Sequence, residues 1–412
     1  MQTLLIRGGR PLTGETLISG SKNAVLPMLA ATVLFREPCR LRNCPNLTDV
    51  DAALRILTYL GAAVERHNSE ILVDPRPICR WDIPQELMCS MRGAVFFAGP
   101  LIARFGYCRL SQPGGCDLGR RPVDFHIQGL QTLGAKQNAE DPSVYRGALC
   151  GAVVELPYPS VGATENLIMA ALGAEGETII VNAAREPEIV NLCDFLRCGG
   201  CGITGDGSDR IRIFGGLPQS GDIEVIPDRM EAATFACAAA SAGGKVLLRK
   251  ATCSHLNAVL DILGRAGCIV QTTPDGICVE ASELYSPGVI TTGPYPEFPT
   301  DAQAPAMGAL LRAKGITIVN ETVFSDRMNH INGMRVLGAD ICRRGNRALI
   351  RGVPGLRGGT VSATDLRAGA GLAVAALAAE GITYLHGMHH LLRGYEDFAG
   401  KLRALGADVE TV

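Results

Sequence analysis

The feature that most constrains the fold of this chain is a motif that recurs six times along its 412 residues. In each copy an alanine-rich helix leads through a glycine turn to a β-branched strand, and a second helix then ends at a glycine before a short pair of strands. A glycine that follows the last turn of a helix is a natural left-handed cap. The six capping glycines lie 66 to 73 residues apart, at Gly61, Gly134, Gly200, Gly267, Gly338 and Gly406.

The first helix of each copy is rich in alanine and glycine, which suits helices that pack closely and are buried on most sides. These helices are expected at residues 23–34, 92–105, 164–176, 231–244, 302–315 and 366–381. Strands rich in β-branched residues are expected after several of them. The clearest strands are residues 178–184, 245–251, 316–322 and 382–388.

The period of the motif argues against a solenoid, because common solenoid repeats span roughly 20–50 residues. Six such units predict two compact halves of three units each. The midpoint falls in the segment EVIPDRMEA, where Pro227 and the charged pair Asp228–Arg229 separate two apolar stretches. We expect a domain boundary there. A cleft between two such halves is where small molecules commonly bind.

Composition narrows the class of protein. Hydrophobic residues make up 47% of the chain and its net charge is -2, which favours a globular protein without a basic field for nucleic acid. Arg7 and Arg10 stand where a signal peptide would need an apolar core, and no apolar run reaches membrane-spanning length. We therefore expect a soluble, intracellular protein.

Fifteen cysteines raise the questions of disulfides and zinc. The chain is too long and too hydrophobic for a secreted disulfide scaffold. The C-x-x-C spacing of Cys198 and Cys201 has no second pair at zinc-ribbon distance. Packing is the better interpretation for most of them, including those in apolar stretches such as Cys39, Cys44, Cys237 and Cys268.

One cysteine differs from the others. Cys116 lies in QPGGCDLGRRPVD, where Gly114–Gly115 leave the backbone free to move and predict a lid-like loop. Arg120–Arg121 favour its thiolate and Asp117 opposes it. The alternative is a buried cysteine in a turn, but polar residues and glycines surround Cys116. A functional role is the better interpretation.

Two helix starts carry candidate polar groups. Ser19–Ser21 precede a helix whose first turn holds Lys22 and Asn23, a place suited to a phosphate or carboxylate. An ordinary serine cap beside an exposed lysine is an equally good interpretation. Thr300 is expected to cap a later helix with Asp301 in its first turn. Asp301 could complement the helix dipole or act as a base, and the local sequence does not decide between these roles.

Four arginines lie in or beside glycine- or alanine-rich segments, namely Arg92, Arg121, Arg367 and Arg393. Guanidinium groups suit carboxylates and phosphates, so together they suggest a small anionic ligand held from several sides. His126, His330, His389 and His390 show no metal-binding spacing. Neither a GxGxxG motif nor a Walker loop is found, which disfavours a nicotinamide or ATP enzyme.

These residues belong to longer segments that resemble the UDP-N-acetylglucosamine 1-carboxyvinyltransferase family, within the EPSP synthase superfamily. The segments are SGSKNAVLPMLAATVL, PGGCDLGRRPVDFHIQGL, PSVGATEN, AAREPEIV, PDRMEAATF, FPTDAQA, ETVFSDR, TDLRAGAGL and RGYEDFAGKLRALGA. The resemblance runs from the first strand to the end of the chain. It implies an α/β protein with two domains, a two-domain inside-out α/β barrel built from six βαβαββ-type repeats. The lobes would be residues 22–226, and residues 1–21 with 227–412.

The resemblance also implies an activity. The family transfers the enolpyruvyl group of phosphoenolpyruvate to the 3′-hydroxyl of UDP-N-acetylglucosamine and releases phosphate, the first committed step of peptidoglycan synthesis. The reaction proceeds by addition and then elimination through a tetrahedral ketal. It implies a cytoplasmic transferase with small-molecule substrates, no cofactor, no metal and no nucleic-acid or membrane partner. It also implies a target of fosfomycin.

Residue roles follow from the same resemblance. Cys116 would protonate the methylene carbon and be a site of covalent adducts, and Asp301 would take the proton of the sugar hydroxyl. Lys22, Arg121 and Arg393 would hold the phosphate and carboxylate of phosphoenolpyruvate, and Arg367 would lie in the same anionic cleft. The UDP-sugar site would be lined by Asn23, Arg92, Arg121, Pro122, Val123, Asp124, Phe125, Ser160, Val161, Gly162, Asp301 and Val323.

The chain departs from the family pattern at a few positions. Met328 stands where the family usually has phenylalanine and Gly333 where it usually has glutamate, whereas Arg327 and His330 are retained. Two alternatives stay open. One is the sister family that acts on shikimate 3-phosphate, which lacks the PGGC loop and the RRPVD segment. The other is a catalytically silent paralogue with a regulatory role.

Overall fold

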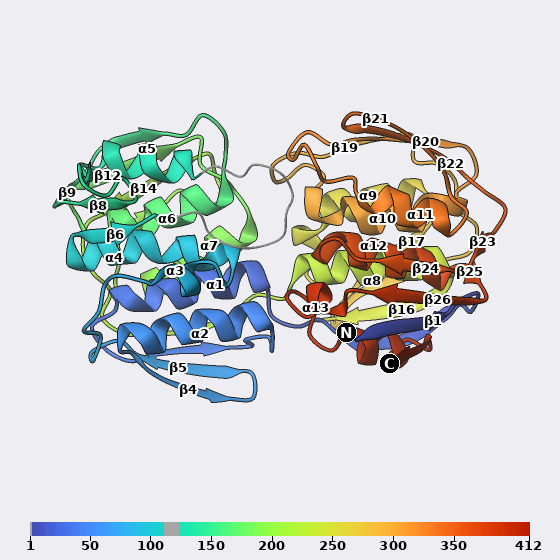
Figure 1. Cartoon of the computed structure of the whole chain (residues 1–412), viewed down its shortest axis with the longest axis horizontal. Helices are drawn as coiled ribbons and strands as arrows, with labels where there is room; N and C mark the ends of the chain where they lie inside the picture. Colours follow the sequence, from blue (N-terminus) through green and yellow to red (C-terminus); the bar gives the residue numbers. More distant parts are fainter. Residues whose placement is uncertain (1, 111–122) are drawn as a thin grey trace. The chain divides into compact units, whose positions relative to one another are not determined.

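The computed structural model describes residues 2–110 and 123–412, and their contacts divide them into two units (Figure 1). We call residues 20–110 and 123–226 the N-terminal unit, and residues 2–19 and 227–412 the C-terminal unit. Each unit has a hydrophobic core of its own.

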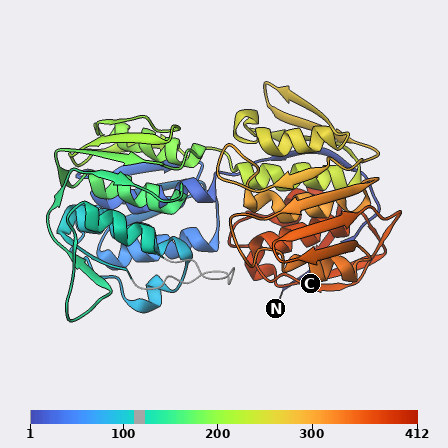
Figure 2. The ribbon, with the colours of Figure 1, turned by 90° about the horizontal axis from the view of Figure 1, so that it is seen from above.

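Three helices form the centre of the C-terminal unit. They are α8 (Arg229–Ala242), α10 (Gln303–Ala309) and α12 (Leu366–Leu377), and each packs against the other two. Every residue of α10 and α12 is buried, as their small side chains predict. The strands of the unit lie towards its outside (Figures 1 and 2).

The N-terminal unit has a similar core. Helix α6 (Val161–Ala171) packs against α1 (Lys22–Ala31) and α4 (Ala98–Phe105), and α4 directly continues the 3-10 helix η2 (Arg92–Phe97). Each of the six expected alanine-rich segments is therefore helical over most of its length, although residues 174–175 and 379–380 at the ends of two of them form the strands β11 and β25. The other short 3-10 helices are η1 (Thr32–Leu34), η3 (Cys253–His255), η4 (Thr300–Ala302) and η5 (Leu310–Arg312).

The second helices surround these cores. Six of them end one or two residues before a capping glycine, and each of those glycines has a positive φ, from 83° at Gly406 to 107° at Gly61. In each case the next amide donates to the carbonyl five residues earlier, as in Ala62 N to Leu57 O and Ala407 N to Leu402 O. These helices are α2 (Thr48–Leu60), α5 (Asp124–Thr132), α7 (Pro187–Cys198), α9 (Asn257–Arg265), α11 (His330–Val336) and α14 (Phe398–Ala404); α3 (Gln85–Met88) and α13 (Met388–Leu391) are single turns.

The larger sheets share one pairing pattern. In each four-stranded sheet the first pair is parallel and the next two pairs are antiparallel. The sheets of the N-terminal unit are β15 (Gly221–Glu224)–β3 (Cys39–Arg42)–β5 (Glu70–Asp74)–β4 (Ala63–His67), β10 (Val153–Glu155)–β12 (Glu177–Val181)–β14 (Arg210–Phe214)–β13 (Ile203–Thr204), the three-stranded β6 (Tyr107–Arg109)–β8 (Val144–Arg146)–β7 (Lys136–Gln137), and the pair β11 (Ala174–Glu175)–β9 (Leu149–Cys150).

The C-terminal unit draws strands from both ends of the chain. Strand β1 pairs with β26 and β27, and β2 pairs in parallel with β16. The sheets are β2 (Leu12–Leu17)–β16 (Gly244–Arg249)–β18 (Gly276–Ala281)–β17 (Ile269–Thr273), β19 (Val289–Thr291)–β20 (Ile316–Asn320)–β22 (Arg347–Arg351)–β21 (Asp340–Arg344), β24 (Thr360–Ser362)–β26 (Ile382–His386)–β1 (Thr3–Arg7)–β27 (Asp408–Thr411), and the pair β23 (Leu356–Arg357)–β25 (Ala379–Glu380). Among the residues that the structure describes, no sheet closes into a barrel.

The surroundings of four cysteines and of Gly333 explain why these small residues are present. The four cysteines named for their apolar surroundings, Cys39, Cys44, Cys237 and Cys268, are all buried free thiols, which confirms a packing role. Gly333 has a packing reason, because a Cβ there would lie 2.6 Å from the Leu372 side chain of α12. Within residues 2–110 and 123–412, no helix combines the length and apolarity that crossing a membrane requires.

Candidate active site

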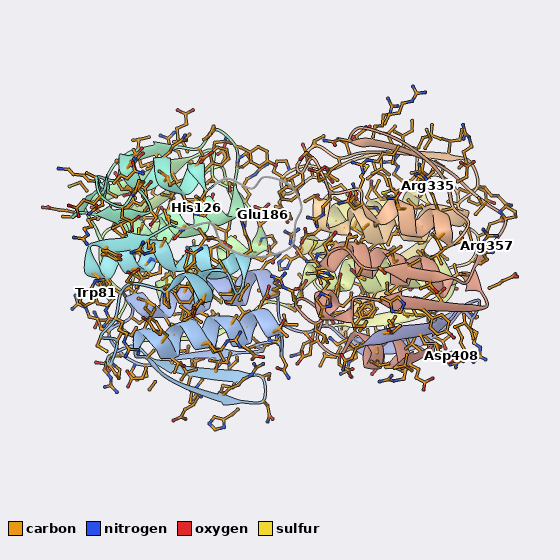
Figure 3. The ribbon with its side chains drawn as sticks, in the orientation of Figure 1. Trp81, His126, Glu186, Arg335, Arg357 and Asp408 are labelled. Carbon is orange, nitrogen blue, oxygen red and sulfur yellow. The ribbon has the colours of Figure 1, made fainter. Side chains whose placement is uncertain are left out.

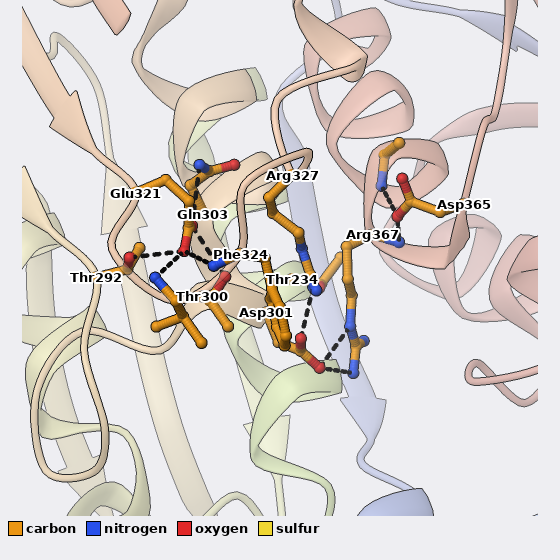
Figure 4. Close-up of polar contacts among 12 residues, drawn as sticks. Thr234, Thr292, Thr300, Asp301, Gln303, Glu321, Phe324, Arg327, Asp365 and Arg367 are labelled. Carbon is orange, nitrogen blue, oxygen red and sulfur yellow. Dashed lines mark hydrogen bonds and ion pairs between the residues drawn. The ribbon is translucent and has the colours of Figure 1, made fainter. Parts of the chain in front are cut away.

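In the C-terminal unit two arginines hold one carboxylate, that of Asp301 (Figure 4). Asp301 accepts a hydrogen bond from Arg327 Nη2 at 2.5 Å, and its other oxygen accepts from Arg367 Nη2 at 2.8 Å and Nε at 3.0 Å. Both guanidinium groups are buried. Burial raises the pKa of Asp301, but the charges of Arg367 and Arg327 outweigh it and hold that pKa well below its usual range.

Arg367 makes further hydrogen bonds besides those to Asp301. Its Nη1 donates to the Tyr395 hydroxyl at 3.0 Å, and that hydroxyl lies 2.8 Å from Thr234 Oγ1. Asp365 caps α12 by accepting from the Arg367 amide at 2.9 Å. The guanidinium is therefore held by Asp301 and Tyr395, which come from two segments of the chain, while Asp365 holds the backbone of Arg367. Burial lowers the pKa of Arg367, but the charge of Asp301 together with Tyr395 and Asp228 raises that pKa above its usual value.

The expected cap at Thr300 is wrong. Thr300 lies inside η4, and its hydroxyl donates to Glu321 Oε2 at 2.9 Å instead of accepting from a helix amide. Glu321 also accepts from the amide of Val323, one of the expected sugar contacts. Arg393 is half-buried in the segment between α13 and α14, two residues before Tyr395.

The start of α1 does not have the geometry of an ordinary capped helix. Ser21 is buried at the N-cap position, yet its side chain makes no cap hydrogen bond and its hydroxyl has no hydrogen-bond partner among the described residues. Lys22 is not an exposed lysine either, because its side chain is 13% exposed and its Nζ lies 2.6 Å from Asp49 Oδ2. Asn23 beside it is half-buried. Neither part of the ordinary interpretation of this helix start holds.

In the N-terminal unit the buried His126 belongs to a hydrogen-bond network centred on Asn166 (Figure 3). Asn166 Oδ1 accepts from Gly99 N at 2.6 Å, so its Nδ2 is the donor to Val95 O at 2.8 Å and to His126 Nδ1 at 2.9 Å. His126 Nδ1 must therefore accept, which fixes the neutral ring with its proton on Nε2. Burial, and to a smaller extent the charge of Arg92, lowers the pKa of His126 to about 4.

Two of the remaining expected residues of this unit, Arg92 and Gly162, lie near that histidine, and the others lie at the starts of α5 and α6. Arg92 begins η2, and burial lowers the pKa of its half-buried guanidinium. Gly162 lies against His126, since a Cβ on Gly162 would be 3.6 Å from the ring. Ser160 caps α6 by accepting from Ala163 N at 3.4 Å, and Val161 follows it. Val123, Asp124 and Phe125 form the start of α5, which packs against α6.

Some expected residues cannot be placed. Cys116, Arg121 and Pro122 lie outside the described residues. The rest fall into two groups, one in each unit. The N-terminal unit holds Lys22, Asn23, Arg92, Val123, Asp124, Phe125, Ser160, Val161 and Gly162, and the C-terminal unit holds Asp301, Val323, Arg367 and Arg393.

Sequence reasoning missed several polar residues of these groups. Asp49 and Tyr395 contact expected site residues, and only tertiary structure brings them there. Glu165 is buried in α6, and neither of its carboxylate oxygens has a hydrogen-bond partner among residues 2–110 and 123–412. Burial raises its pKa well above the usual value, and the neighbouring charges of Glu188 and Glu186 add to that effect. A glutamate inside the apolar run GATENLIMAA was the available signal.

The described residues contain no cluster of metal-binding side chains. No three histidine, cysteine, aspartate or glutamate side chains among the described residues are grouped so that they could hold a metal ion. What the two groups offer instead is several guanidinium groups, one lysine, and polar helix starts. Such an arrangement can bind anions and orient a carboxylate as a proton acceptor.

Comparison with known proteins identifies relatives along the whole chain. The family profile described as EPSP synthase (3-phosphoshikimate 1-carboxyvinyltransferase) matches residues 6–402. A UDP-N-acetylglucosamine 1-carboxyvinyltransferase from Synechocystis sp. is 44% identical, over 100% of this chain and 96% of the relative. One of the same name from Gloeobacter violaceus is 45% identical, over 99% of this chain and 90% of the relative.

Solved structures of enolpyruvyl transferases also resemble this chain. The enolpyruvyl transferase NikO from Streptomyces tendae superposes with a TM-score of 0.89 at 25% identity, over 100% of this chain and 99% of that one. An EPSP synthase from Acinetobacter baumannii superposes with a TM-score of 0.75 at 19% identity, with both chains fully covered. The fold is therefore the α/β fold of the enolpyruvyl transferases.

Proposed function

Because the chain belongs to the UDP-N-acetylglucosamine 1-carboxyvinyltransferase family of enolpyruvyl transferases, we propose that it transfers the enolpyruvyl group of phosphoenolpyruvate to the 3′-hydroxyl of UDP-N-acetylglucosamine, with release of phosphate. The observation that carries this proposal is the sequence identity of 41% to 45%, over nearly the whole chain, with relatives of that name. The product would commit the sugar to peptidoglycan synthesis. The cytoplasmic location stays a prediction.

The proposed reaction has two steps. In the addition, the Cys116 thiol gives its proton to the methylene carbon of phosphoenolpyruvate while the sugar hydroxyl oxygen attacks the adjacent carbon and loses its proton to Asp301. The product is a tetrahedral ketal that still carries phosphate. In the elimination, phosphate leaves with the electron pair of its C–O bond, the methyl group returns a proton to the Cys116 thiolate, and the double bond is restored. The proton held by Asp301 leaves with the phosphate.

The anionic groups of the reagent need cationic partners that do not move during the reaction. We propose Lys22, Arg121 and Arg393 for the phosphate and carboxylate of phosphoenolpyruvate, with Arg367 in the same cleft. The ion pair of Lys22 with Asp49 and the anchoring of the Arg367 guanidinium by Asp301 and Tyr395 support these roles. Asn23, Arg92, Pro122, Val123, Asp124, Phe125, Ser160, Val161, Gly162 and Val323 are proposed to line the UDP-sugar site with Arg121 and Asp301.

The ion pairs of Asp301 bear directly on its proposed role as a base. A carboxylate held by Arg327 and Arg367 is a weak base, because its negative charge is already stabilised. An anionic reagent near Arg367 would share that positive charge and raise the pKa of Asp301. We therefore propose that binding of phosphoenolpyruvate strengthens Asp301 as a proton acceptor, so that deprotonation of the sugar follows loading of the reagent.

We also propose the finer organisation expected from the sequence, six βαβαββ-type units arranged as an inside-out barrel in each lobe. The six equivalent glycine closures and the repeated sheet pattern support it. We propose residues 22–226 as one lobe and residues 1–21 with 227–412 as the other. The division of the described residues near positions 19 and 226 supports these bounds.

The proposal is tested by measuring phosphate release from phosphoenolpyruvate with each of two acceptors. Turnover is expected with UDP-N-acetylglucosamine and not with shikimate 3-phosphate. The second acceptor is included because the matching family profile carries the name of the shikimate enzyme. Turnover with shikimate 3-phosphate alone would replace the proposal with that activity. Binding of UDP-N-acetylglucosamine without any phosphate release would favour a silent regulatory paralogue.

A further inference from the structure

Glu321 is a buried carboxylate that accepts five hydrogen bonds (Figure 4). Its Oε1 accepts from Thr292 Oγ1 at 3.0 Å and from the amides of Val323 at 2.8 Å and Phe324 at 3.1 Å. Its Oε2 accepts from Thr300 Oγ1 at 2.9 Å and Gln303 Nε2 at 3.2 Å. A carboxylate offers about four lone-pair positions, so every acceptor site of this side chain is used.

The five donors come from three separate segments. Thr292 follows β19, Thr300 and Gln303 lie on either side of Asp301 in η4 and α10, and the two amides belong to the loop after β20. Thr292 ties this loop a second time, because its Oγ1 accepts from Thr322 N at 2.9 Å. One side chain therefore fixes the turn that carries Asp301 relative to the loop that carries Val323.

We propose that Glu321 is a positioning residue for the acceptor sugar, and that it acts by holding Asp301 and Val323 at a fixed spacing. The inference rests on the proposed function, in which both residues face the UDP-sugar. Glu321 itself touches neither substrate in this account. Its effect passes through Thr300 and Gln303 to Asp301, and through the loop amides to Val323.

The chemistry of the pocket predicts which substitution is tolerated. In Glu321→Gln the amide oxygen can replace Oε1 and keep Thr292, Val323 and Phe324 as donors. The amide nitrogen then replaces Oε2 and needs acceptors. The Thr300 hydroxyl can turn to accept, and Gln303 can flip, because its Oε1 is buried with no hydrogen-bond partner among the described residues. Glu321→Leu has a similar volume and removes the acceptor of all five donors, although the Thr292 hydroxyl has another acceptor in reach, Asn320 O at 3.5 Å.

The experiment measures both Michaelis constants for the full chain. Glu321→Leu is expected to raise KM for UDP-N-acetylglucosamine about tenfold or more, with KM for phosphoenolpyruvate within about twofold of wild type. Glu321→Gln is expected to stay within about threefold for both substrates. Equal changes in the two constants, no change in either, or a glutamine variant as impaired as the leucine variant would each overturn the proposal.

A matched control separates positioning from general loss of stability. Asp206 is a largely buried carboxylate of the N-terminal unit that accepts from Arg197 Nη1 at 2.7 Å and Nη2 at 2.9 Å. Asp206→Leu should lower the melting temperature and leave both Michaelis constants unchanged. If Glu321→Leu does not fold, Thr300→Val removes a single donor and should raise KM for the sugar alone by about threefold. No change in that variant would then contradict the proposal.

A readout that does not depend on turnover keeps this inference distinct from the proposed function. Hydrogen exchange at the Val323 and Phe324 amides should be at least about tenfold faster in Glu321→Leu and unchanged in Glu321→Gln. If wild type releases no phosphate with UDP-N-acetylglucosamine, the proposed function fails whatever the exchange rates are. If turnover is normal and the leucine variant exchanges at the wild-type rate, the positioning role fails instead.

Discussion

Mild acid should destabilise the N-terminal unit through His126. The ring accepts a hydrogen bond from Asn166 Nδ2, and the other contacts of Asn166, to Gly99 and Val95, prevent its amide from flipping. Protonation at Nδ1 would therefore place two donors against each other in a buried site. The positive charge of Arg92 adds repulsion.

The size of the effect follows from the shift in pKa. Burial lowers the pKa of His126 from 6.5 to about 4, so the unfolded chain binds more protons between those values and stability falls as the pH falls. At about 1.4 kcal/mol per pH unit the loss reaches roughly 3 kcal/mol by about pH 4. That is a large share of the total stability of a domain, about 5–15 kcal/mol.

Urea unfolding followed by tryptophan fluorescence measures the loss of free energy of unfolding in the N-terminal unit. Trp81 is the single tryptophan of the chain and lies in the N-terminal unit (Figure 3), so its emission reports on that unit. The control is His126→Gln, whose amide oxygen can accept from Asn166 and does not titrate. Between about pH 7 and about pH 4.5 wild type should lose about 2 to 3 kcal/mol more than the variant. A difference below about 0.5 kcal/mol would refute the reasoning.

Three further predictions concern single positions. Tyr395→Phe leaves a buried N–H of Arg367 without its partner and should lower the free energy of unfolding by about 1.5–3 kcal/mol in urea titrations, and a loss below about 0.5 kcal/mol would contradict the anchoring. Gly267→Ala places a side chain at φ 101° and should lower the free energy of unfolding by about 1–2 kcal/mol. Gly264→Ala lies inside α9, where a Cβ meets nothing within 4 Å, and should raise that free energy by about 0.5–1 kcal/mol. Changes of the same sign in both variants would argue against the glycine closure. Fosfomycin should label Cys116 alone among fifteen cysteines in intact-protein mass spectra, and labelling that persists in Cys116→Ser would refute the assignment.

The parts of the fold that the sequence predicts are those set by local chemistry. The alanine-rich helices and the glycine closures depend on residues within a few positions of one another, so Gly61 or Gly406 can be recognised without knowing the tertiary structure. The β-branched strands follow for the same reason. Pairing of β1 with β26 and β27 joins the two ends of the chain, and only the family resemblance predicted that the first strand lies there.

The site shows where local reasoning fails. Thr300 has the sequence of a helix cap, but Glu321 lies 21 residues away and its carboxylate competes successfully for the hydroxyl. Lys22 follows a serine that looks like a cap, and its partner Asp49 comes from the next helix. The position of Asp301 in a first helical turn suggested a dipole role, whereas two arginines from distant segments set its charge. Tertiary partners decide the chemistry of these groups.

The central claim is that a proton from the enzyme reaches the methylene carbon of phosphoenolpyruvate before phosphate leaves. Turnover in D₂O with UDP-N-acetylglucosamine tests it, followed by NMR of the product. The ketal has a methyl group with one solvent-derived hydrogen, and elimination removes any of its three hydrogens, so deuterium should appear in the vinyl methylene of the product. Cys116→Ser should form far less of this product. A product formed at the wild-type rate with no deuterium at that carbon would contradict the account.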